Sequence, residues 1–294
     1  MTSPGAELRA QMQERIVVMP GVFNAISARV AAAEGASALY LSGAGVTNAL
    51  LAVPDIALIT LPEMAQQAAH AVQASGLPII ADADTGYGET FNVKRTVHEF
   101  ERAGLAGLHL EDQVSPKRCG HLDGKSLISP DDMTKKIKVA LESRKDESFM
   151  VIARTDARGV EGLEAALERA KRYEAAGADA IFPEGLHNEA EFEEFRKAIA
   201  IPLLANMTEF GKTDLISVSR FEALGYNMVI FPMTAFRIML KALSGCYRTL
   251  LKEGSQADLM PEMWSRQMLY DLIRYADYEA LDRSWSDQFD EIET

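Results

Sequence analysis

Cysteine is almost absent from this chain, since Cys119 and Cys246 are the only two among 294 residues. Two cysteines cannot form the disulfide framework of a small secreted domain, and reduced thiols are typical of the cytoplasm. Long apolar runs are also missing, because none reaches the roughly 18 residues that a membrane-spanning helix needs. The N-terminal segment is polar and mixed in charge, unlike a secretory signal. These absences predict a cytoplasmic protein.

Positive charge is scarce as well. Lysine and arginine number 30 against 43 aspartates and glutamates, which gives a formal net charge of −13. This balance argues against nucleic acid or an anionic membrane surface as the main partner. A small anionic substrate would therefore need a local cluster of basic side chains in order to bind.

Short apolar runs alternate with amphipathic stretches along most of the chain. The runs cover residues 15–21, 37–43, 77–84, 106–113, 149–157, 178–185, 201–208 and 227–233. Continuous apolar strands separated by helices are typical of a parallel sheet that is covered on both faces. Eight such units predict an α/β protein with a TIM-type (β/α)8 barrel. A doubly wound open sheet is the alternative, which the lack of a Gly-rich dinucleotide fingerprint after the first strand makes weaker.

The segment after the last run has a helical pattern, over residues 234–276. We therefore predict one barrel domain over residues 1–294, with extra C-terminal helices from about residue 234. The acidic tail beyond them carries aromatic residues. Two interpretations stay open for this tail: it packs on a neighbouring subunit, or it is a frayed helix on the surface.

Polar residues stand at the ends of several consecutive runs, where a βα barrel gathers its active site. Single polar residues at strand ends are often turn formers or helix caps. Barrel closure, however, would direct a whole series of them at one place. The series consists of Asp82, Asp84, His109, Glu111, Asp112, Arg154, Asp156, Glu184, Asn206 and Thr208.

The third and fourth runs carry carboxylates that could hold a metal ion. Asp82 and Asp84 are two residues apart on a strand, so their side chains face the same way, and Glu111 is one strand over. Hard carboxylates without clustered His or Cys suit Mg²⁺ or Mn²⁺. The alternative is that Asp84 caps a turn and Asp82 pairs with a lysine. His109, taken alone, is more typical of a hydrogen-bonded core histidine.

One loop places a cysteine among positive charges, in "QVSPKRCGHLDGK" at residues 113–125. Proline and glycine exclude a regular helix there. The pKa of a free thiol is about 8.5, and neighbouring cations lower it. Cys119, flanked by Lys117, Arg118 and His121, is therefore a candidate acid, base or nucleophile. The alternative is that Cys119 is a small apolar residue packed under the loop. Cys246, in the helical context "LSGCYRTLL", fits such a packing role well.

These motifs together resemble the isocitrate lyase superfamily of phosphoenolpyruvate mutase-like barrels, and within it the 2-methylisocitrate lyases. The resemblance extends over nearly the whole chain. It rests on "KRCGH" (117–121), "DADTGYGETFNVKRTV" (82–97), "LANMTEFG" (204–211) and "FPMTAFRIM" (231–239), among others. It implies a carbon–carbon lyase that cleaves 2-methylisocitrate to pyruvate and succinate, as in propionate catabolism through the methylcitrate cycle.

The resemblance also implies roles for individual residues. Asp82 and Asp84 match the aspartates that bind Mg²⁺ (or Mn²⁺), and Asp55 matches a further acidic residue near the metal. Cys119 matches the acid that protonates the leaving group. The catalytic set implied in this way is Cys119, Tyr40, Glu111 and His109.

The positions implied to bind substrate are spread over most strand ends. They are Ser42, Gly43, Ala44, Lys117, Arg118, Gly120, His121, Arg154, Glu184, Asn206, Thr208, Arg237 and Arg266. The superfamily's methylisocitrate lyases commonly have glycine at position 44. Ala44 is therefore a departure, which affects how closely the backbone can approach a ligand.

Several alternatives remain at this point. Sibling lyases and hydrolases carry the same cysteine loop: isocitrate lyase, 2,3-dimethylmalate lyase and oxaloacetate hydrolase. A binding barrel without catalysis, which senses a dicarboxylate, is a different class. The resemblance further implies a small di- or tricarboxylate as the ligand and a homotetramer in which C-terminal helices are exchanged.

Overall fold

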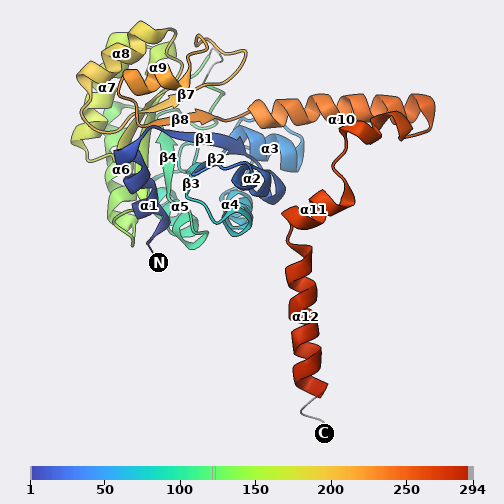
Figure 1. Ribbon diagram of the computed structural model, residues 1–294. Coiled ribbons are helices and arrows are strands. Elements are labelled where there is room, and N and C mark those ends of the chain that lie inside the picture. Colours follow the sequence, from blue (N-terminus) through green and yellow to red (C-terminus); the bar gives the residue numbers. More distant parts are fainter. Residues whose placement is uncertain (1, 121, 123, 291–294) are drawn as a thin grey trace. The chain divides into compact units, whose positions relative to one another are not determined.

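The computed structural model describes residues 2–120, 122 and 124–290. The chain forms two compact units, with the boundary between Arg237 and Ile238. The first unit contains an eight-stranded parallel sheet in the order β6-β5-β4-β3-β2-β1-β8-β7 (Figure 1). A parallel bridge between Ile181 and Leu203 links the remaining edges. The predicted (β/α)8 barrel is thereby confirmed, and the open doubly wound sheet is wrong.

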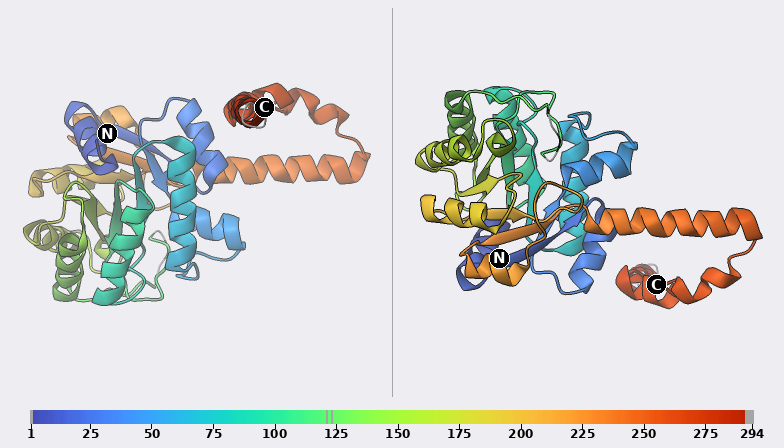
Figure 2. Two further views of the ribbon diagram at one scale, coloured as in Figure 1. Left: turned by 90° about the horizontal axis from the view of Figure 1, so that it is seen from below. Right: turned by 90° about the horizontal axis from the view of Figure 1, so that it is seen from above.

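Each predicted apolar run overlaps one strand. The strands are β1 (Val17–Val22), β2 (Leu39–Leu41), β3 (Ile79–Asp82), β4 (Gly107–Glu111), β5 (Met150–Thr155), β6 (Ala180–Pro183), β7 (Leu204–Asn206) and β8 (Met228–Phe231). The helices of this unit are α1 (Pro4–Glu14), α2 (Ala25–Ala33), α3 (Gly43–Leu51), α4 (Leu61–Ser75), α5 (Thr90–Arg102), α6 (Pro130–Ser143), α7 (Leu163–Ala175), α8 (Glu189–Ala198) and α9 (Val218–Ala223), with a 3₁₀ turn η1 (Ala157–Gly159). The helices lie outside the strands (Figure 2).

Helix α4 shows how local sequence sets these elements. Thr60 precedes it, and the Thr60 backbone N–H donates to Glu63 at 2.8 Å, one half of a capping box. Gly76 ends the helix with a φ of 69°, a left-handed conformation that glycine adopts at low cost. The residues buried against the barrel recur with helical spacing, at Leu61, Met64, Ala68 and Ala71.

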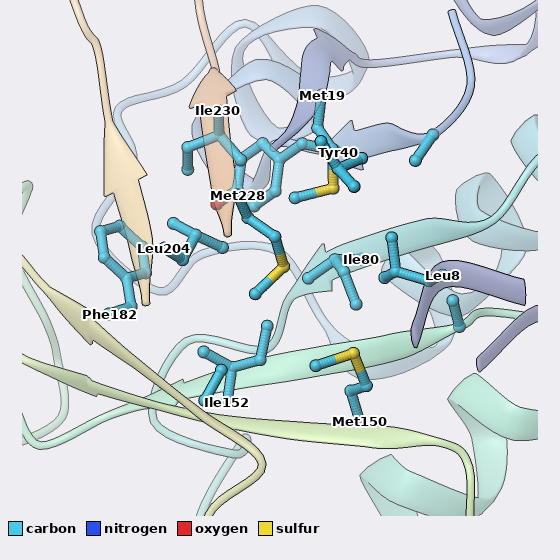
Figure 3. Packing of buried hydrophobic residues seen from close by; sticks show 14 residues of the cluster. Leu8, Met19, Tyr40, Ile80, Met150, Ile152, Phe182, Leu204, Met228 and Ile230 are labelled. Atoms are coloured by element: carbon cyan, nitrogen blue, oxygen red, sulfur yellow. The ribbon is translucent and has the colours of Figure 1, made fainter. Parts of the chain in front are cut away.

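The barrel interior is packed in layers contributed by alternate strands (Figure 3). The odd strands supply one buried layer of large apolar residues: Met19, Ile80, Ile152 and Leu204. The even strands supply the layer above it: Tyr40, His109, Phe182 and Ile230. At the N-terminal end of the strands, Leu8 of α1 joins the same buried cluster as Met150 and is fully buried. The interior is therefore a solid core up to the Tyr40 layer.

The second unit contains the remainder of α10 (Thr234–Glu253), the 3₁₀ turn η2 (Ala257–Glu262), α11 (Arg266–Leu272) and α12 (Tyr275–Asp290). The extra C-terminal helices expected from about residue 234 are thus present. Whether they belong to one domain with the barrel stays a prediction. Across the described part of the chain, no helix combines the length and the apolar character needed to cross a membrane.

Candidate active site

A pocket of about 360 Å³ opens among the C-terminal ends of the barrel strands and the segments that follow them. Its floor includes Tyr40, Phe182 and Ile230, the even-strand layer of the core. The side chains above that floor are mostly polar. Those that line the pocket are Ser42, Asn48, Asp55, Asp82, Lys117, Cys119, Arg154, Glu184, Asn206, Thr208, Glu209 and Arg237.

The period of the strands explains why polar groups converge here. Side chains two residues apart on a strand face the same way, so the residue two beyond each core position also points inward. On β3 the apolar Ile80 is followed by Asp82, on β5 Ile152 is followed by Arg154, and on β7 Leu204 is followed by Asn206. The strand register sets Glu111 beside Arg154 and Asp82 beside His109. The inward-pointing side chains of the strands therefore change from apolar to polar at the same height in the barrel.

Tyr40, His109 and Asp82 form a chain that runs from the core into the pocket. The Tyr40 hydroxyl lies 2.8 Å from His109 Nε2, and that nitrogen lies 3.6 Å from Asp82 Oδ1. Burial lowers the pKa of His109 to about 4 despite the nearby Asp82. Burial and the charge of Asp82 raise the pKa of Tyr40 well above its usual value. At neutral pH the imidazole is therefore neutral and the phenol keeps its proton.

Arg154 is fixed among carboxylates. Its Nε and NH2 donate to the two oxygens of Asp156 at 2.9 and 3.1 Å, and Nε lies 3.3 Å from Glu111 Oε2. Its NH1 lies 3.5 Å from Glu184 Oε2, and the guanidinium lies 5.2 Å from the centre of the Phe182 ring. Burial favours the neutral form of an arginine, but Asp156, Glu111 and Glu184 raise the pKa of Arg154 well above its usual value. This arginine is a permanent, positioned positive charge.

Lys117 brings the cysteine loop to the acidic pair. Its buried ammonium lies 2.6 Å from Asp55 Oδ1 and 2.9 Å from Asp84 Oδ1. The Asp84 backbone N–H donates in turn to Asp82 Oδ1 at 2.9 Å, which accounts for part of the turn after β3. Burial raises the pKa of Asp84 to about 7, and the charges of Asp82 and Asp55 add to this effect against that of Lys117.

The acidic cluster formed by Asp82, Asp84 and Glu111 could hold a cation in addition to the side chains of Lys117 and Arg154. Both carboxylate oxygens of Glu111 are buried without a hydrogen bond among the described residues. Burial raises the pKa of Glu111 well above its usual value. Asp82, Asp84 and Glu111 offer hard oxygen donors, the type that Mg²⁺ prefers. Within the described residues, however, no three His, Cys, Asp or Glu side chains are arranged as a metal-binding group, and Lys117 lies between Asp55 and Asp84.

Cys119 lies in the pocket wall, on the loop between β4 and α6, and is exposed. The loop backbone next to it is tightly placed, because a Cβ added at Gly120 would lie 2.4 Å from Glu184 Cγ and 2.7 Å from Arg154 NH2. Lys125 donates to the Gly120 carbonyl and to Asp156 Oδ1, the latter at 2.9 Å. Cys119 is thus held at the same end of the barrel as Asp82.

The far wall of the pocket holds the second arginine. Arg237 lies in the first turn of α10. Its NH1 donates to Thr208 Oγ1 at 3.3 Å and to Glu209 Oε2. Thr234 Oγ1 also donates to Glu209. The Arg237 guanidinium lies 5.5 Å from the centre of the Phe210 ring.

Most of the residues implied by the sequence come together in this pocket, although their roles stay predictions. Those that line it are Tyr40, Ser42, Ala44, Asp55, Asp82, Lys117, Cys119, Gly120, Arg154, Glu184, Asn206, Thr208 and Arg237. His109, Glu111 and Asp84 are buried behind its wall, and Gly43 packs so closely that an added Cβ would lie 2.6 Å from Asp82 Oδ2.

Two further implied positions, Arg118 and Arg266, are exposed, and a third lies outside the described residues. The backbone carbonyl and N–H of Arg118 form hydrogen bonds with the side chain of Gln113, and this arginine is not among the residues that line the pocket. Arg266 begins α11 in the second unit and is also exposed. His121 lies outside the described residues.

Sequence reasoning missed several contributors. Lys125 and Glu209 were not singled out, although Lys125 is the last residue of "QVSPKRCGHLDGK" and Glu209 lies within "LANMTEFG". Asp112, expected only as a polar strand end, is buried and accepts hydrogen bonds from the Asp156 backbone, Thr155 and Tyr173. It supports Asp156, which in turn holds Arg154.

The fold and these side chains define a class: a TIM-type barrel whose C-terminal end presents arginines, a lysine, an acidic cluster and a thiol to a small anionic molecule. The chain belongs to the phosphoenolpyruvate phosphomutase family, whose model matches residues 8–251.

Curated relatives match almost the full chain. A 2-methylisocitrate lyase of Aeropyrum pernix is 51% identical over 290 residues, which cover 98% of this chain and 93% of the relative. A 2-methylisocitrate lyase of Bacillus subtilis is 45% identical over 269 residues, which cover 92% of this chain and 88% of the relative. Such identities confirm the superfamily expected from the motifs.

Solved structures of the superfamily agree in fold. The crystal structure of 2,3-dimethylmalate lyase, a PEP mutase/isocitrate lyase superfamily member, has a TM-score of 0.91 at 34% identity, covering 97% of this chain and 96% of that one. Oxaloacetate acetylhydrolase in complex with 3,3-difluorooxalacetate has a TM-score of 0.91 at 34% identity, covering 96% and 97%. Phosphonopyruvate hydrolase in complex with oxalate and Mg²⁺ has a TM-score of 0.87 at 25% identity, covering 96% and 99%.

Proposed function

We propose that this chain is a carbon–carbon lyase that cleaves 2-methylisocitrate to pyruvate and succinate. The observation that carries the proposal is that Cys119, Tyr40, Asp82 and Arg154 all line one pocket. The reaction needs each kind of group: one that accepts a proton from the substrate hydroxyl, cations that hold carboxylates, and an acid that protonates a carbanion. The relatives named 2-methylisocitrate lyase, at up to 51% identity over nearly the full chain, support the same choice of substrate.

Binding comes first, and the pocket supplies cations from different elements. Arg154 projects from β5 and Arg237 from α10, and a guanidinium can bind a carboxylate through two parallel hydrogen bonds. The first turn of α3, at Ser42 and Ala44, adds backbone N–H groups at a helix N-terminus, which favour anions. A tricarboxylate can therefore be held at several points despite the chain's net charge of −13.

Bond cleavage begins at the substrate hydroxyl. Tyr40 and His109 form a pair through which a proton can move: the phenol oxygen accepts the hydroxyl proton as its own proton passes to His109 Nε2. The alkoxide collapses to the ketone of pyruvate, and the electron pair of the broken carbon–carbon bond stays on the succinate half. The Cys119 thiol gives its proton to that carbanion, which completes succinate and leaves a thiolate.

We further propose that Mg²⁺ is the cofactor, with Asp82 and Asp84 as its protein ligands, Glu111 and Asp55 nearby, and Mn²⁺ as a substitute. The buried, hydrogen-bond-deficient oxygens of Glu111 and the raised pKa of Asp84 support a missing positive charge at this place. Phosphonopyruvate hydrolase binds Mg²⁺ together with oxalate. When bound, a divalent ion would acidify the substrate hydroxyl and polarise the forming carbonyl.

The sibling activities are not favoured. The solved 2,3-dimethylmalate lyase and oxaloacetate acetylhydrolase share 34% identity with the chain, against 51% for the 2-methylisocitrate lyase of Aeropyrum pernix. Arg237 also offers a contact for a third carboxylate, which dimethylmalate lacks. A binding barrel without catalysis would have no use for the pocket thiol.

The direct test incubates the purified protein with 2-methylisocitrate and Mg²⁺ and measures pyruvate and succinate, with and without EDTA. We expect both products in equal amounts, and we expect EDTA to stop their formation. Parallel assays with isocitrate and 2,3-dimethylmalate, compared as kcat/KM, separate the siblings. A higher kcat/KM for either of these would overturn the choice of substrate.

We also propose a homotetramer that exchanges C-terminal helices, as the resemblance implies. The second unit supports self-association, because many of its large apolar side chains are exposed. Examples are Tyr247, Leu251, Trp264, Tyr278 and Trp285. Light scattering coupled to size-exclusion chromatography tests the stoichiometry: a mass of four chains supports the proposal, and a monomer contradicts it. The cytoplasmic location stays a prediction.

A further inference from the structure

Arg237 differs from Arg154 in the kind of partner that holds it. The carboxylates around Arg154 are buried, with side-chain exposures of 0% for Asp156 and Glu111 and 3% for Glu184. Glu209, which pairs with Arg237, is 26% exposed, and Arg237 itself is 36% exposed. Both line the pocket. The partner of Arg237 is therefore partly in contact with solvent, whereas the partners of Arg154 are buried.

Glu209 is charged when it makes this pair. Burial raises the pKa of Glu209, but hydrogen bonds from Thr234 and Arg237 outweigh this effect and leave the pKa below its usual value. Glu209 thus gives Arg237 what a substrate carboxylate would give it: an ionised group with oxygen acceptors at the pocket wall. A guanidinium whose charge is already balanced by a neighbouring carboxylate attracts a second anion less strongly.

The segment that carries Glu209 has the form of a turn that can move without disturbing the core. Phe210 has a φ of 60° and is 95% exposed, and Gly211 follows it. The barrel strand itself ends before this turn, at Asn206. The ring of Phe210 near the Arg237 guanidinium is the other contact that this turn makes with the arginine.

We propose that Glu209 is a specificity-determining residue: it holds Arg237 while the pocket is empty, and a carboxylate of the substrate must replace it. This inference deepens the proposed function and rests on it for the identity of the substrate. A ligand with a carboxylate at this point exchanges one ion pair for another. A ligand without one leaves Glu209 in place and gains nothing from Arg237. Glu209 thereby lowers the affinity of Arg237 for any anion, so that only a ligand that is also held at other points of the pocket can replace it.

The test uses tricarballylate, which has three carboxylates and no hydroxyl, so that it cannot undergo the cleavage. Its dissociation constant is measured by calorimetry, in the presence of Mg²⁺, for the wild type, Glu209→Gln, Arg237→Gln and the double variant. We expect E209Q to bind three- to tenfold more tightly than the wild type, because Arg237 loses its resident partner. In the R237Q background the same substitution should change affinity by less than twofold.

A matched control is Glu189→Gln, which breaks the pair between Glu189 of α8 and Arg220 of α9, outside the pocket residues. It should leave the dissociation constant unchanged. Equal or weaker binding by E209Q, with an unchanged melting temperature, would overturn the proposal, as would the absence of measurable binding by every variant. A gain that persists in the R237Q background would show plain charge repulsion and would also overturn it. Because the probe is not turned over, these results are separate from a failure to cleave 2-methylisocitrate.

Discussion

Lys125 and Asp156 form an ion pair of 2.9 Å in which the two side chains are only 2% and 0% exposed. The same ammonium donates to the Gly120 carbonyl, and the same carboxylate holds Arg154. One buried pair thus connects the cysteine loop with the central arginine of the pocket. Removing one partner of a buried ion pair is strongly destabilising, because the other charge stays buried without compensation. The connection between the loop and Arg154 is therefore rigid.

Lys125→Met should therefore uncouple the loop from the barrel. We expect a fall in kcat of tenfold or more, because Cys119 loses its fixed position, and a smaller rise in KM. Steady-state kinetics and limited proteolysis of the loop measure the two effects. Arg144→Met, which breaks a partly buried pair with Asp179 at the opposite end of the barrel, is the control and should leave kcat within twofold. Equal losses in the two variants would indicate a general stability effect.

Cys119→Ser should separate binding from turnover. A serine hydroxyl is a far weaker acid than a thiol at neutral pH, so we expect kcat to fall by at least 10²-fold. The affinity for tricarballylate should change by less than threefold, because the arginines and the acidic cluster are unaltered. Cys246→Ser, in α10 outside the pocket residues, is the control and should behave as the wild type. Unchanged turnover in C119S would remove the thiol from the mechanism.

Asp82→Asn should weaken metal binding, since one hard anionic donor becomes a neutral amide. We expect the dissociation constant for Mg²⁺, from calorimetry on the EDTA-treated protein, to rise at least tenfold. Asp146→Asn, which changes an aspartate that bonds Ser148 outside the pocket residues, serves as the control. Tight Mg²⁺ binding that survives D82N would place the ion elsewhere.

A fourth prediction concerns stability and pH at Glu191 on α8. Burial raises the pKa of this carboxyl, but hydrogen bonds from Arg158 and the His187 backbone N–H outweigh it, so the folded pKa lies below the ordinary value of 4.5. The stabilisation is therefore complete above that value and is lost as the pH falls through the folded pKa.

Glu191→Gln should accordingly lower the free energy of unfolding by about 1 to 2 kcal/mol at pH 7, and the difference from wild type should shrink below pH 4. Thermal melts between pH 3 and pH 7 check this. Glu189→Gln, whose pair with Arg220 is exposed, should have a small effect at every pH. A deficit in E191Q that stays constant with pH would mean that lost packing, and not charge, is responsible.

The barrel could be predicted from the sequence because its strands are buried on both faces and appear as continuous apolar runs. The strand ends were equally readable: Asp82, Arg154 and Asn206 each follow an inward core residue by two positions. Strand period alone brings these side chains to one height, and closure of the barrel brings them to one pocket.

Other parts of the site depend on contacts that no local pattern encodes. The pairing of Lys117 with Asp55 spans 62 residues, and that of Lys125 with Asp156 spans 31. Their partners were visible as charged residues, but only the folded loop decides which carboxylate each lysine meets. The Glu209–Arg237 pair was hidden for the same reason, since it links the turn after β7 with the first part of α10.

Leu8 has a consequence for how the chain is made. It lies in α1 and is completely buried in a cluster that also contains Met150, Leu204 and Met228, which are side chains of β5, β7 and β8. Contacts between residues so distant along the chain are slow to form. Until these strands have been synthesised, Leu8 lacks part of its cover, and a nascent polypeptide that contains α1 exposes apolar surface that the finished barrel buries.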